Sequence, residues 1–361
     1  MDFSHIVVGG GVIGLSIAAR LARAGLRVAL LEKHAMVGQE TSARNSEVIH
    51  AALYHPPESL RTRLCIEGKQ QIYQWAKSAG VEARQCGKWV VAQTPQEAEY
   101  LHQMVERAKT TKVPLEYISL DKAKLLEPSI TAKEAILVSP TTGIVSAHSL
   151  MDFYQAEIQK YDGEVILNTK VVGLEKLAHG YRVTCESAGE TVDLDSEVVI
   201  NSAGLYAPDV SNMLLPKERH ITALYAKGTY FSYPLGKPKV NRLIYPCPSG
   251  PASLGTHLTI DLSGRLRFGP DLEWVGSATD YTVSSKNLNA AREAVKQYID
   301  IDVSLLEPDY SGIRPKIAKG YQDFVIREED GFPGFVNLLN IESPGLTASP
   351  AVGNYVYDLV R

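Results

Sequence analysis

Short apolar runs flank one amphipathic stretch at the start of the chain. Residues 6–8 and residues 27–31, which are apolar after Arg27, have the length expected for buried strands. Between them, the apolar positions of residues 12–24 recur with a helical period and stop at Gly25, a residue type that commonly follows a helix. The pattern predicts one strand–helix–strand unit.

Two later apolar runs end in small residues or in a turn. Residues 198–200 predict a buried strand, and the small side chains of residues 201–204 after it let a backbone approach another group closely. Residues 335–360 predict a strand, a Pro-Gly turn and a helix, with Ser349 as the N-cap and Pro350 at the first helical position.

The middle of the chain is typical of a sheet. Residues 86–92 and 224–233 are rich in aromatic and β-branched side chains, and further short strands are expected between residues 243 and 270. Residues 286–299 predict an amphipathic helix, with charge on one face and apolar side chains on the other. Residues 327–330 predict a solvated turn.

Composition narrows the class of protein. The chain has 361 residues, of which 45% are hydrophobic, so it can bury a large core, and its length suggests two interleaved domains. The 37 Lys and Arg against 41 Asp and Glu give a net charge of −4 without like-charge blocks. We therefore expect neither a nucleic-acid partner nor a polybasic membrane segment.

The four cysteines, Cys65, Cys86, Cys185 and Cys247, lie far apart and form no C-x-x-C pair. This spacing argues against a metal site or a disulfide scaffold and favours a reducing compartment. No targeting segment or transmembrane run is apparent, so a cytoplasmic protein is expected, with a mitochondrial or membrane-peripheral location left open.

Three glycines mark the turn of the first unit. Gly9, Gly11 and Gly14 have G-x-G-x-x-G spacing between the first strand and the helix, and Glu32 closes the second strand. Such glycines permit a tight turn, the approach of a pyrophosphate to a helix N-terminus, and close packing of helix and strand, while the acid accepts hydrogen bonds from a ribose. The unit predicts a dinucleotide site without distinguishing NAD from FAD.

The polar loop of residues 38–60 follows that unit in place of a further strand–helix alternation. Its hydroxyl, amide and guanidinium groups suit the phosphates or ribityl chain of a cofactor, although the same composition is also typical of a surface loop. The positive N-terminus of the C-terminal helix is suited to stabilising negative charge on a reduced flavin.

Several longer stretches carry a resemblance to a known family. They are RNSEVIHAALYHPPESLRTRLCIEG, CGKWVVA, SPTTGIVS, NSAGLYA, IYPCPSG, GTHLTIDLSGRLRFGP, GIRPK and NIESPGLTASPAVG. With these stretches the chain resembles the D-amino-acid-oxidase-type FAD oxidoreductases nearly end to end, and most closely their L-2-hydroxyglutarate dehydrogenase branch.

The resemblance implies an α/β fold, α+β overall, in which a Rossmann-like FAD-binding domain of discontinuous segments carries an inserted antiparallel β-sheet substrate domain. Residues 1–84, 141–220 and 311–361 are expected in the first domain, and residues 85–140 and 221–310 in the second. The expected FAD contacts are Gly9, Gly11, Val12, Ile13, Gly14, Glu32, Lys33, Thr41, Ser42, Arg44, Asn45, Ser46, Val172, Ala203, Gly204, Gly312, Pro344, Gly345, Leu346 and Thr347.

The chain departs from that branch at three places. Glu47 stands where the branch usually has glycine, His55 stands where it has a tyrosine or a similar residue, and the segment between Pro270 and Gly312 is much shorter than in the longer members. These departures leave the identity of the substrate open.

Oxidation of an alcohol by a flavin needs a base, because a hydroxyl is too weak an acid to lose its proton unaided near neutral pH. His257 and His50 lie in stretches that match the branch and are the candidates, each expected to titrate near neutrality. A satisfied core histidine is the competing interpretation for both, and His50 is also a candidate to contact the flavin.

A carboxylate substrate needs a planar cation, and Arg314 is the candidate because arginine binds carboxylate through two parallel hydrogen bonds. A second carboxylate needs another donor, for which Lys88, Tyr54 and Tyr245 are candidates. For Lys88, a strand position that faces solvent is an equally good interpretation.

The sequence therefore predicts FAD-dependent oxidation of a 2-hydroxy acid, similar to L-2-hydroxyglutarate, to the 2-oxo acid. An amine or amino-acid oxidase of the same superfamily is the alternative, and a non-catalytic flavoprotein is a third possibility that the histidine and arginine candidates disfavour. The electron acceptor, whether oxygen, a quinone or an electron-transfer protein, is left open, and no metal site is expected.

Overall fold

The computed structural model describes residues 1–248 and 255–361 of the chain. Its helices are α1 (Val12–Arg23), α2 (Leu60–Ser78), α3 (Pro95–Thr111), α4 (Leu120–Leu126), α5 (Ala147–Lys160), α6 (Ala207–Asn212), α7 (Leu288–Lys296) and α8 (Gly345–Val360). The sequence IYPCPSG extends to residue 250, so its last two residues lie outside the described part.

One sheet contains the strands of the first unit. Its order is β10 (Thr169–Lys176), β11 (Tyr181–Ser187), β12 (Glu190–Asn201), β1 (Phe3–Val8), β2 (Val28–Leu31) and β9 (Glu164–Ile166), with β20 (Phe332–Leu339) beside β12 and β19 (Val325–Glu329) beside β20. β12, β1, β2 and β9 run parallel, as a Rossmann-like unit requires. The predicted strand–helix–strand unit is confirmed.

A second sheet is built from the middle of the chain. Its order is β17 (Glu273–Val275), β13 (Leu224–Ser232), β16 (Leu266–Gly269), β15 (His257–Ile260), β14 (Leu243–Pro246), β5 (Lys88–Ala92), β7 (Ala135–Ser139) and β6 (Glu116–Ile118), with β18 (Glu307–Lys316) beside β13. A small third sheet joins β3 (Val48–Ile49), β8 (Gly143–Val145) and β4 (Ala83–Arg84). The pairs of the second sheet are antiparallel except for β14 with β5.

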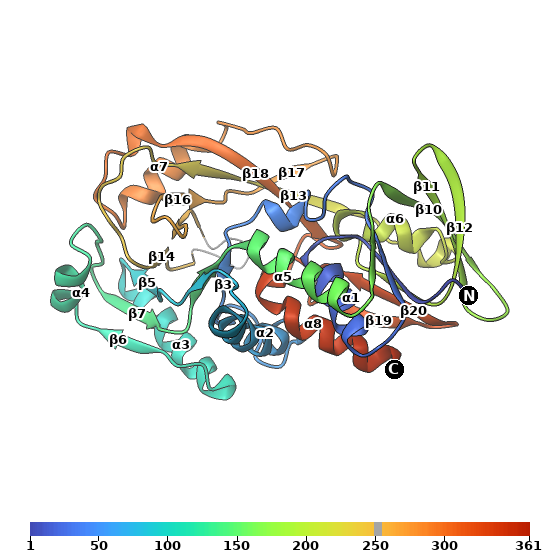
Figure 1. Cartoon of the computed structure of the whole chain (residues 1–361). Helices are drawn as coiled ribbons and strands as arrows, with labels where there is room; N and C mark the ends of the chain where they lie inside the picture. Colours follow the sequence, from blue (N-terminus) through green and yellow to red (C-terminus); the bar gives the residue numbers. More distant parts are fainter. Residues whose placement is uncertain (249–254) are drawn as a thin grey trace.

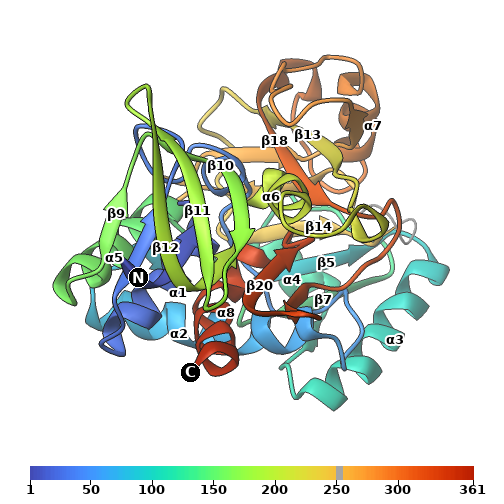
Figure 2. The ribbon, with the colours of Figure 1, turned by 90° about the vertical axis from the view of Figure 1, so that its right-hand side faces the viewer.

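The two large sheets lie on opposite sides of a group of helices. Figure 1 shows both chain termini on the side of the first sheet, and α3, α4 and α7 on the side of the second. α1 packs against α5 and α8, and α8 also packs against α2. In the turned view of Figure 2, β10, β11 and β12 form one flank of the molecule, while α3 and α7 lie toward the other.

One boundary of the expected domain division, at residue 311, falls inside β18. β18 pairs with β13 of the second sheet, and its last residues approach the loop that follows β2, because Thr41 Oγ1 donates to Ile313 O at 2.9 Å. β18 therefore links the second sheet to the loop that follows β2, and the division into domains stays a prediction.

The predicted start of the C-terminal helix is wrong. α8 begins at Gly345, so Ser349 is not its N-cap and Pro350 lies inside it. Proline has no N–H to donate to Leu346 O, but the Ser349 hydroxyl donates to that carbonyl at 3.0 Å. The serine thus replaces the hydrogen bond that the proline removes.

The predicted turn at residues 327–330 is also wrong for most of its length. Residues 325–329 form β19, and Glu329 is buried with only 2% of its surface exposed. Its carboxylate accepts from Asn337 Nδ2 at 2.9 Å and forms an ion pair with Arg219. These contacts come from distant segments, so the local charge pattern gave no sign of them.

Candidate active site

One cavity of about 1610 Å³ takes its lining from both large sheets and from α1 and α8. The expected site residues that line it are His50, His257, Arg314, Tyr54, Tyr245, Gly9, Gly11, Val12, Ile13, Glu32, Lys33, Thr41, Ser42, Arg44, Asn45, Ser46, Ala203, Gly204, Gly312, Pro344, Gly345 and Leu346. Gly14, Lys88, Val172 and Thr347 do not line it. Val171, the neighbour of Val172, does.

The glycines at one end of the cavity are required by close backbone contacts. Gly9 has φ +102°, and a Cβ there would lie 2.8 Å from Ser202 O. A Cβ on Gly14 would lie 1.9 Å from Gly9 O. Gly14 therefore allows α1 to pack on the β1 turn, as the third glycine of a dinucleotide fingerprint does.

Glu32 is held in place at the end of β2. Its Oε2 accepts from Gly10 N at 2.7 Å and its Oε1 accepts from His34 N at 2.8 Å. Each carboxylate oxygen keeps a further lone pair, and the residue lines the cavity. The acid is thus fixed where it can accept a hydrogen bond from a ribose hydroxyl.

The N-terminus of α1 opens onto the same end of the cavity. The N-cap residue of α1 is Gly11, which has no side chain to cap the helix. The first turn of α1 contains no acidic residue. Val12 N donates to Ser42 Oγ at 2.9 Å, which draws the following loop over the turn. A positive helix end whose N-cap residue offers no side-chain acceptor suits a diphosphate.

The loop from Thr41 to Ser46 is partly held by its own contacts. Asn45 Nδ2 donates to Ser42 O at 2.7 Å, and Asn45 Oδ1 accepts from Glu47 N at 2.7 Å. Its amide therefore shapes the loop. Ser46 Oγ lies 3.0 Å from the hydroxyl of Tyr230, which is a lining residue of β13 that the sequence did not single out.

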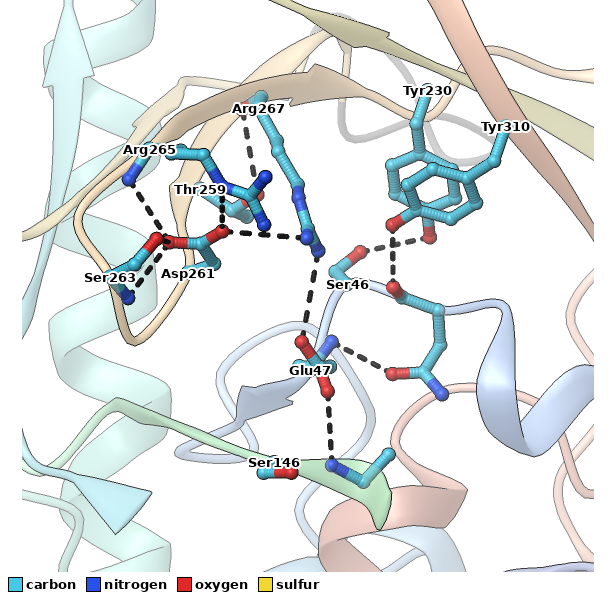
Figure 3. A network of polar contacts seen from close by, with 12 residues as sticks. Ser46, Glu47, Ser146, Tyr230, Thr259, Asp261, Ser263, Arg265, Arg267 and Tyr310 are labelled. Atoms are coloured by element: carbon cyan, nitrogen blue, oxygen red, sulfur yellow. Dashed lines mark hydrogen bonds and ion pairs between the residues drawn. The ribbon is translucent and has the colours of Figure 1, made fainter. Parts of the chain in front are cut away.

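Figure 3 shows how this loop is tied to the second sheet. Tyr310 Oη donates to Asn45 O at 2.7 Å, and its ring stacks on Tyr230 at 4.4 Å. Glu47 accepts from Ala147 N at 3.0 Å and lies 3.7 Å from Arg267 Nη1. The cofactor loop, α5 and β16 thus form one polar network.

Arg267 also connects this network to Asp261, because its Nη2 lies 3.5 Å from the Asp261 carboxylate. Burial alone would raise the pKa of that carboxyl, but hydrogen bonds from Ser263 and Arg265 and the charge of Arg265 lower the pKa to about 2. Asp261 is therefore ionised over the whole physiological range.

The start of α8 borders the middle of the cavity. Pro344, Gly345 and Leu346 line it, and no side chain caps the helix. Thr347 is buried behind them, where its hydroxyl donates to Val48 O and accepts from His50 N, both at 3.0 Å. Thr347 therefore fixes His50 and β3 against the positive end of α8.

His257 has a defined tautomer. Its Nδ1 is 3.1 Å from Gly255 O, and a carbonyl oxygen only accepts, so Nδ1 carries the proton and Nε2 has a free lone pair. Burial, aided by the charges of Lys88 and Arg314, lowers the pKa of His257 to about 3. The expectation that it titrates near neutrality is wrong for the free protein, because the imidazole is neutral throughout that range.

His50 is neutral for the same reasons. Burial, then the charges of Lys88 and His257, lower its pKa well below the usual value. Its Nε2 lies 3.3 Å from Ser343 Oγ. Both candidate bases thus face one cavity in the form that accepts a proton.

Arg314 supplies an unpaired cation beside them. It lies on β18 opposite Ala226 of β13 and lines the cavity. Among the carboxylates of that cavity, Glu342 pairs with Arg61 and Lys316, and Glu47 pairs with Arg267. Within the described residues no ion pair involves Arg314, so its guanidinium is available to an anionic ligand.

The sequence makes Lys88 a candidate either to bind a second carboxylate or to face solvent, and its position matches neither interpretation. It does not face solvent, because none of its surface is exposed, and it does not line the cavity either. Its Nζ lies over the rings of Tyr54 and Tyr245, which do line the cavity.

The chain is similar to known proteins over nearly its whole length. The family model described as FAD dependent oxidoreductase matches residues 4–359. The mitochondrial L-2-hydroxyglutarate dehydrogenase of Arabidopsis thaliana is 35% identical, over 97% of this chain and 82% of its own length. Glycerol 3-phosphate dehydrogenase of Caloramator mitchellensis is 31% identical, over 99% of this chain and 74% of its own length.

Among solved structures, the dithionite-reduced L-α-glycerophosphate oxidase of Mycoplasma pneumoniae with FAD bound superimposes with a TM-score of 0.88. The match covers 99% of this chain and 94% of that one at 23% identity, and so it shows a shared fold. Together with the family match over nearly the whole length, these findings identify the chain as a member of the FAD dependent oxidoreductase family and as an FAD enzyme.

Proposed function

We propose that this protein oxidises a 2-hydroxy acid with a second anionic group, similar to L-2-hydroxyglutarate, to the 2-oxo acid. The observation that carries the proposal is the pairing of Arg314, a cation without an ion-pair partner among the described residues, with a neutral His257 in one cavity. The similarity to L-2-hydroxyglutarate dehydrogenases over nearly the whole chain supports the substrate class.

The residues of the nucleotide end fit FAD. Gly9, Gly11 and the first turn of α1 would hold its diphosphate, Glu32 its ribose, and the loop of Thr41–Ser46 with the start of α8 its flavin half. FAD, when bound, supplies the acceptor for the hydride that leaves C2 of the substrate.

Side chains of the protein bind the substrate carboxylate and accept one proton. Arg314 donates two hydrogen bonds to the C1 carboxylate and so orients C2. His257 Nε2 accepts the hydroxyl proton as the C2–H bond breaks, which leaves the carbonyl of the 2-oxo acid. His50 is the alternative base.

Anaerobic titration of the purified flavoprotein tests the proposal. Addition of L-2-hydroxyglutarate should bleach the flavin absorbance, whereas D-2-hydroxyglutarate and L-glutamate should leave it oxidised. Reduction by amines or amino acids alone would show an amine or amino-acid oxidase, and no reduction by any of them would indicate a different substrate class.

Glycerol 3-phosphate is the second candidate, because one relative with 31% identity is a glycerol 3-phosphate dehydrogenase. Its secondary hydroxyl and its anionic group suit the same base and cation. Reduction of the flavin by glycerol 3-phosphate in place of 2-hydroxyglutarate would select this candidate.

We further propose a reducing compartment, such as the cytoplasm, on the basis of the four free thiols. Among the described residues, no helix combines the length and apolar character needed to cross a bilayer. Reoxidation of the reduced enzyme by oxygen, by a quinone and by an electron-transfer flavoprotein, measured side by side, identifies the acceptor.

A further inference from the structure

Lys88 is a buried lysine next to the part of the cavity that Tyr54, Tyr245, His257 and Arg314 line, which we call the substrate end. It is the first residue of β5, which lies between β14 and β7 in the second sheet. The alternation of a strand places Lys88 on the same face as Val90 and Ala92, which pack into an apolar cluster with Leu53. None of its surface is exposed.

The ammonium group lies over two aromatic rings that are nearly parallel. Its Nζ lies 4.5 Å from the ring centroid of Tyr54 and 4.4 Å from that of Tyr245. The two rings are 6.4 Å apart with an interplanar angle of 8°. Nζ also donates to Tyr54 Oη at 3.2 Å, so the cation both stacks on this wall and fixes a hydroxyl in it.

The same wall supports the candidate base. The ring of Tyr245 stacks on the imidazole of His257 with centroids 4.0 Å apart. Tyr54, Tyr245 and His257 all line the cavity, whereas Lys88 lies behind them. Any effect of Lys88 on a ligand in the cavity therefore acts through this wall and through its electric field.

Within the described part of the chain, no carboxylate forms an ion pair with Lys88. Among the described residues, the titratable groups that face Lys88 are Tyr54, Tyr245, Cys65, His50 and His257, and burial makes each of them hold its neutral form. A buried cation without a counterion lowers the free energy of unfolding, because its lost hydration is not compensated by an opposite charge.

We propose that Lys88 is a specificity-determining positioning residue, whose ammonium makes the Tyr54–Tyr245 wall electropositive and so selects substrates that carry a second anionic group. This proposal rests on the proposed function. It names the residue that favours substrates with a second anionic group. Lys88 itself does not touch the substrate.

The charge of Lys88 changes within the pH range in which the enzyme can be assayed. Burial lowers its pKa to about 7, from an ordinary value of 10.5. Its positive charge is therefore present at acidic pH and is lost as pH rises through about 7. At a distance of several ångströms in a partly desolvated site, loss of one charge changes binding of an anion by about 10- to 100-fold.

Two acids of equal chain length isolate the effect. L-2-Hydroxyglutarate carries the second carboxylate, and L-2-hydroxypentanoate has a methyl group in its place. The ratio of their kcat/KM values for anaerobic flavin reduction, measured from pH 5.5 to 9, cancels the titration of any base that both substrates use. In the wild type we expect this ratio to favour the dicarboxylate and to fall as pH rises through about 7.

Three variants complete the test. Lys88→Met should lower the ratio by about 10- to 100-fold and make it independent of pH, whereas Lys88→Arg should keep it high up to pH 9. Lys69→Met is the matched control, because Lys69 is a buried lysine of α2 whose Nζ donates to Thr141 Oγ1 at 2.9 Å, and it does not line the cavity. It should leave the ratio unchanged.

Stability separates this role from a purely structural one. Lys88→Met removes an uncompensated buried charge, so its Tm should equal or exceed that of the wild type. A lower Tm with equal losses of kcat/KM for both acids would overturn the proposal.

A measurement without turnover separates the proposal from the proposed function. Glutarate and pentanoate should perturb the flavin spectrum on binding, with a ratio of Kd values that favours glutarate and depends on Lys88 in the same way. If 2-hydroxyglutarate is not oxidised but this Kd ratio follows Lys88, only the proposed function fails. If Lys88→Met leaves the Kd ratio unchanged, the role of Lys88 fails.

Discussion

The nucleotide end and the substrate end of the cavity are built in different ways. At the nucleotide end, the glycines of the β1 turn make close backbone contacts, and Glu32 accepts from two backbone N–H groups. At the substrate end, side chains from β5, β14, β15 and β18 meet, and Lys88 and Arg314 form no ion pair within the described residues.

This difference indicates what each end is for. At the nucleotide end, Glu32 and the loop of Thr41–Ser46 are held by hydrogen bonds within the chain, and two helix N-termini face the cavity, which suits a resident cofactor. The substrate end holds charge that the fold does not neutralise, and such charge is expected where an anionic ligand binds and leaves. Substitutions at the two ends should therefore fail in different ways.

The largest effect is expected from Gly14→Ala at the nucleotide end. The added methyl group would lie 1.9 Å from Gly9 O, which is backbone and cannot move without opening the β1 turn. We expect the variant to be purified without FAD or to unfold. The flavin absorbance per protein and the melting curve measure this.

Gly276→Ala is the control for that substitution, because nothing lies within 4 Å of its added Cβ. It should keep FAD and the wild-type melting curve. A yellow, stable Gly14→Ala protein would show that close packing of α1 on the turn does not hold the cofactor.

At the substrate end, His257→Asn should slow anaerobic flavin reduction by about 10²- to 10⁴-fold while FAD stays bound. Asparagine keeps a donor near the position of Nδ1 for Gly255 O and removes the base at Nε2. Stopped-flow absorbance measures the rate. A normal rate would exclude His257 as the base, and His50→Asn would then be the variant to test.

The pH profile gives a second readout for His257. A base with a pKa of about 3 is neutral above that pH, so its own titration should not appear in kcat/KM between pH 5.5 and 8, and activity from this group is lost only as pH falls toward 3. A limb near pH 6.5 that His257→Asn abolishes would contradict the buried, neutral state of the imidazole.

Arg314→Lys should lower kcat/KM by about 10- to 1000-fold, because the ammonium group cannot donate two parallel hydrogen bonds to a carboxylate. Both the dicarboxylate and the monocarboxylate should lose equally, in contrast to the Lys88 variants. Arg327→Lys is the control, since Arg327 is 60% exposed on β19 and does not line the cavity. Unchanged kinetics in Arg314→Lys would remove Arg314 from the site.

The same contrast explains how far the sequence predicted the molecule. The strand–helix–strand unit, its glycines and Glu32 follow from local spacing, because local backbone geometry imposes them. The two histidines and Arg314 were predicted through resemblance, and the structure places all three in one cavity. Their chemical roles stay predictions.

What the sequence missed depends on contacts between distant segments. Pro350 lies inside α8 because the Ser349 hydroxyl replaces a backbone donor, and Glu329 is buried because Asn337 and Arg219 meet it. Lys88 lies behind the cavity wall, where the rings of Tyr54 and Tyr245 from two other segments contact its ammonium group. No local pattern encodes these partners.

The smallest effect is expected where the two ends join, at Glu47. This residue has φ +55°, a conformation that costs a non-glycine residue about 1 kcal/mol, and glycine is usual there in the branch that the chain resembles. Its carboxylate offsets the strain by accepting from Ala147 N at 3.0 Å and pairing with Arg267.

Glu47→Ala loses those bonds and keeps the strain, whereas Glu47→Gly loses the bonds and relieves the strain. The alanine variant should therefore be less stable than the glycine variant by about 1 kcal/mol in unfolding free energy, and the glycine variant should lie within about 1 kcal/mol of the wild type. Chemical denaturation of the FAD-loaded proteins measures both differences. Equal stability of the two variants would show that Glu47 is not strained, and the polar network of Figure 3 would then hold the cofactor loop at no conformational cost.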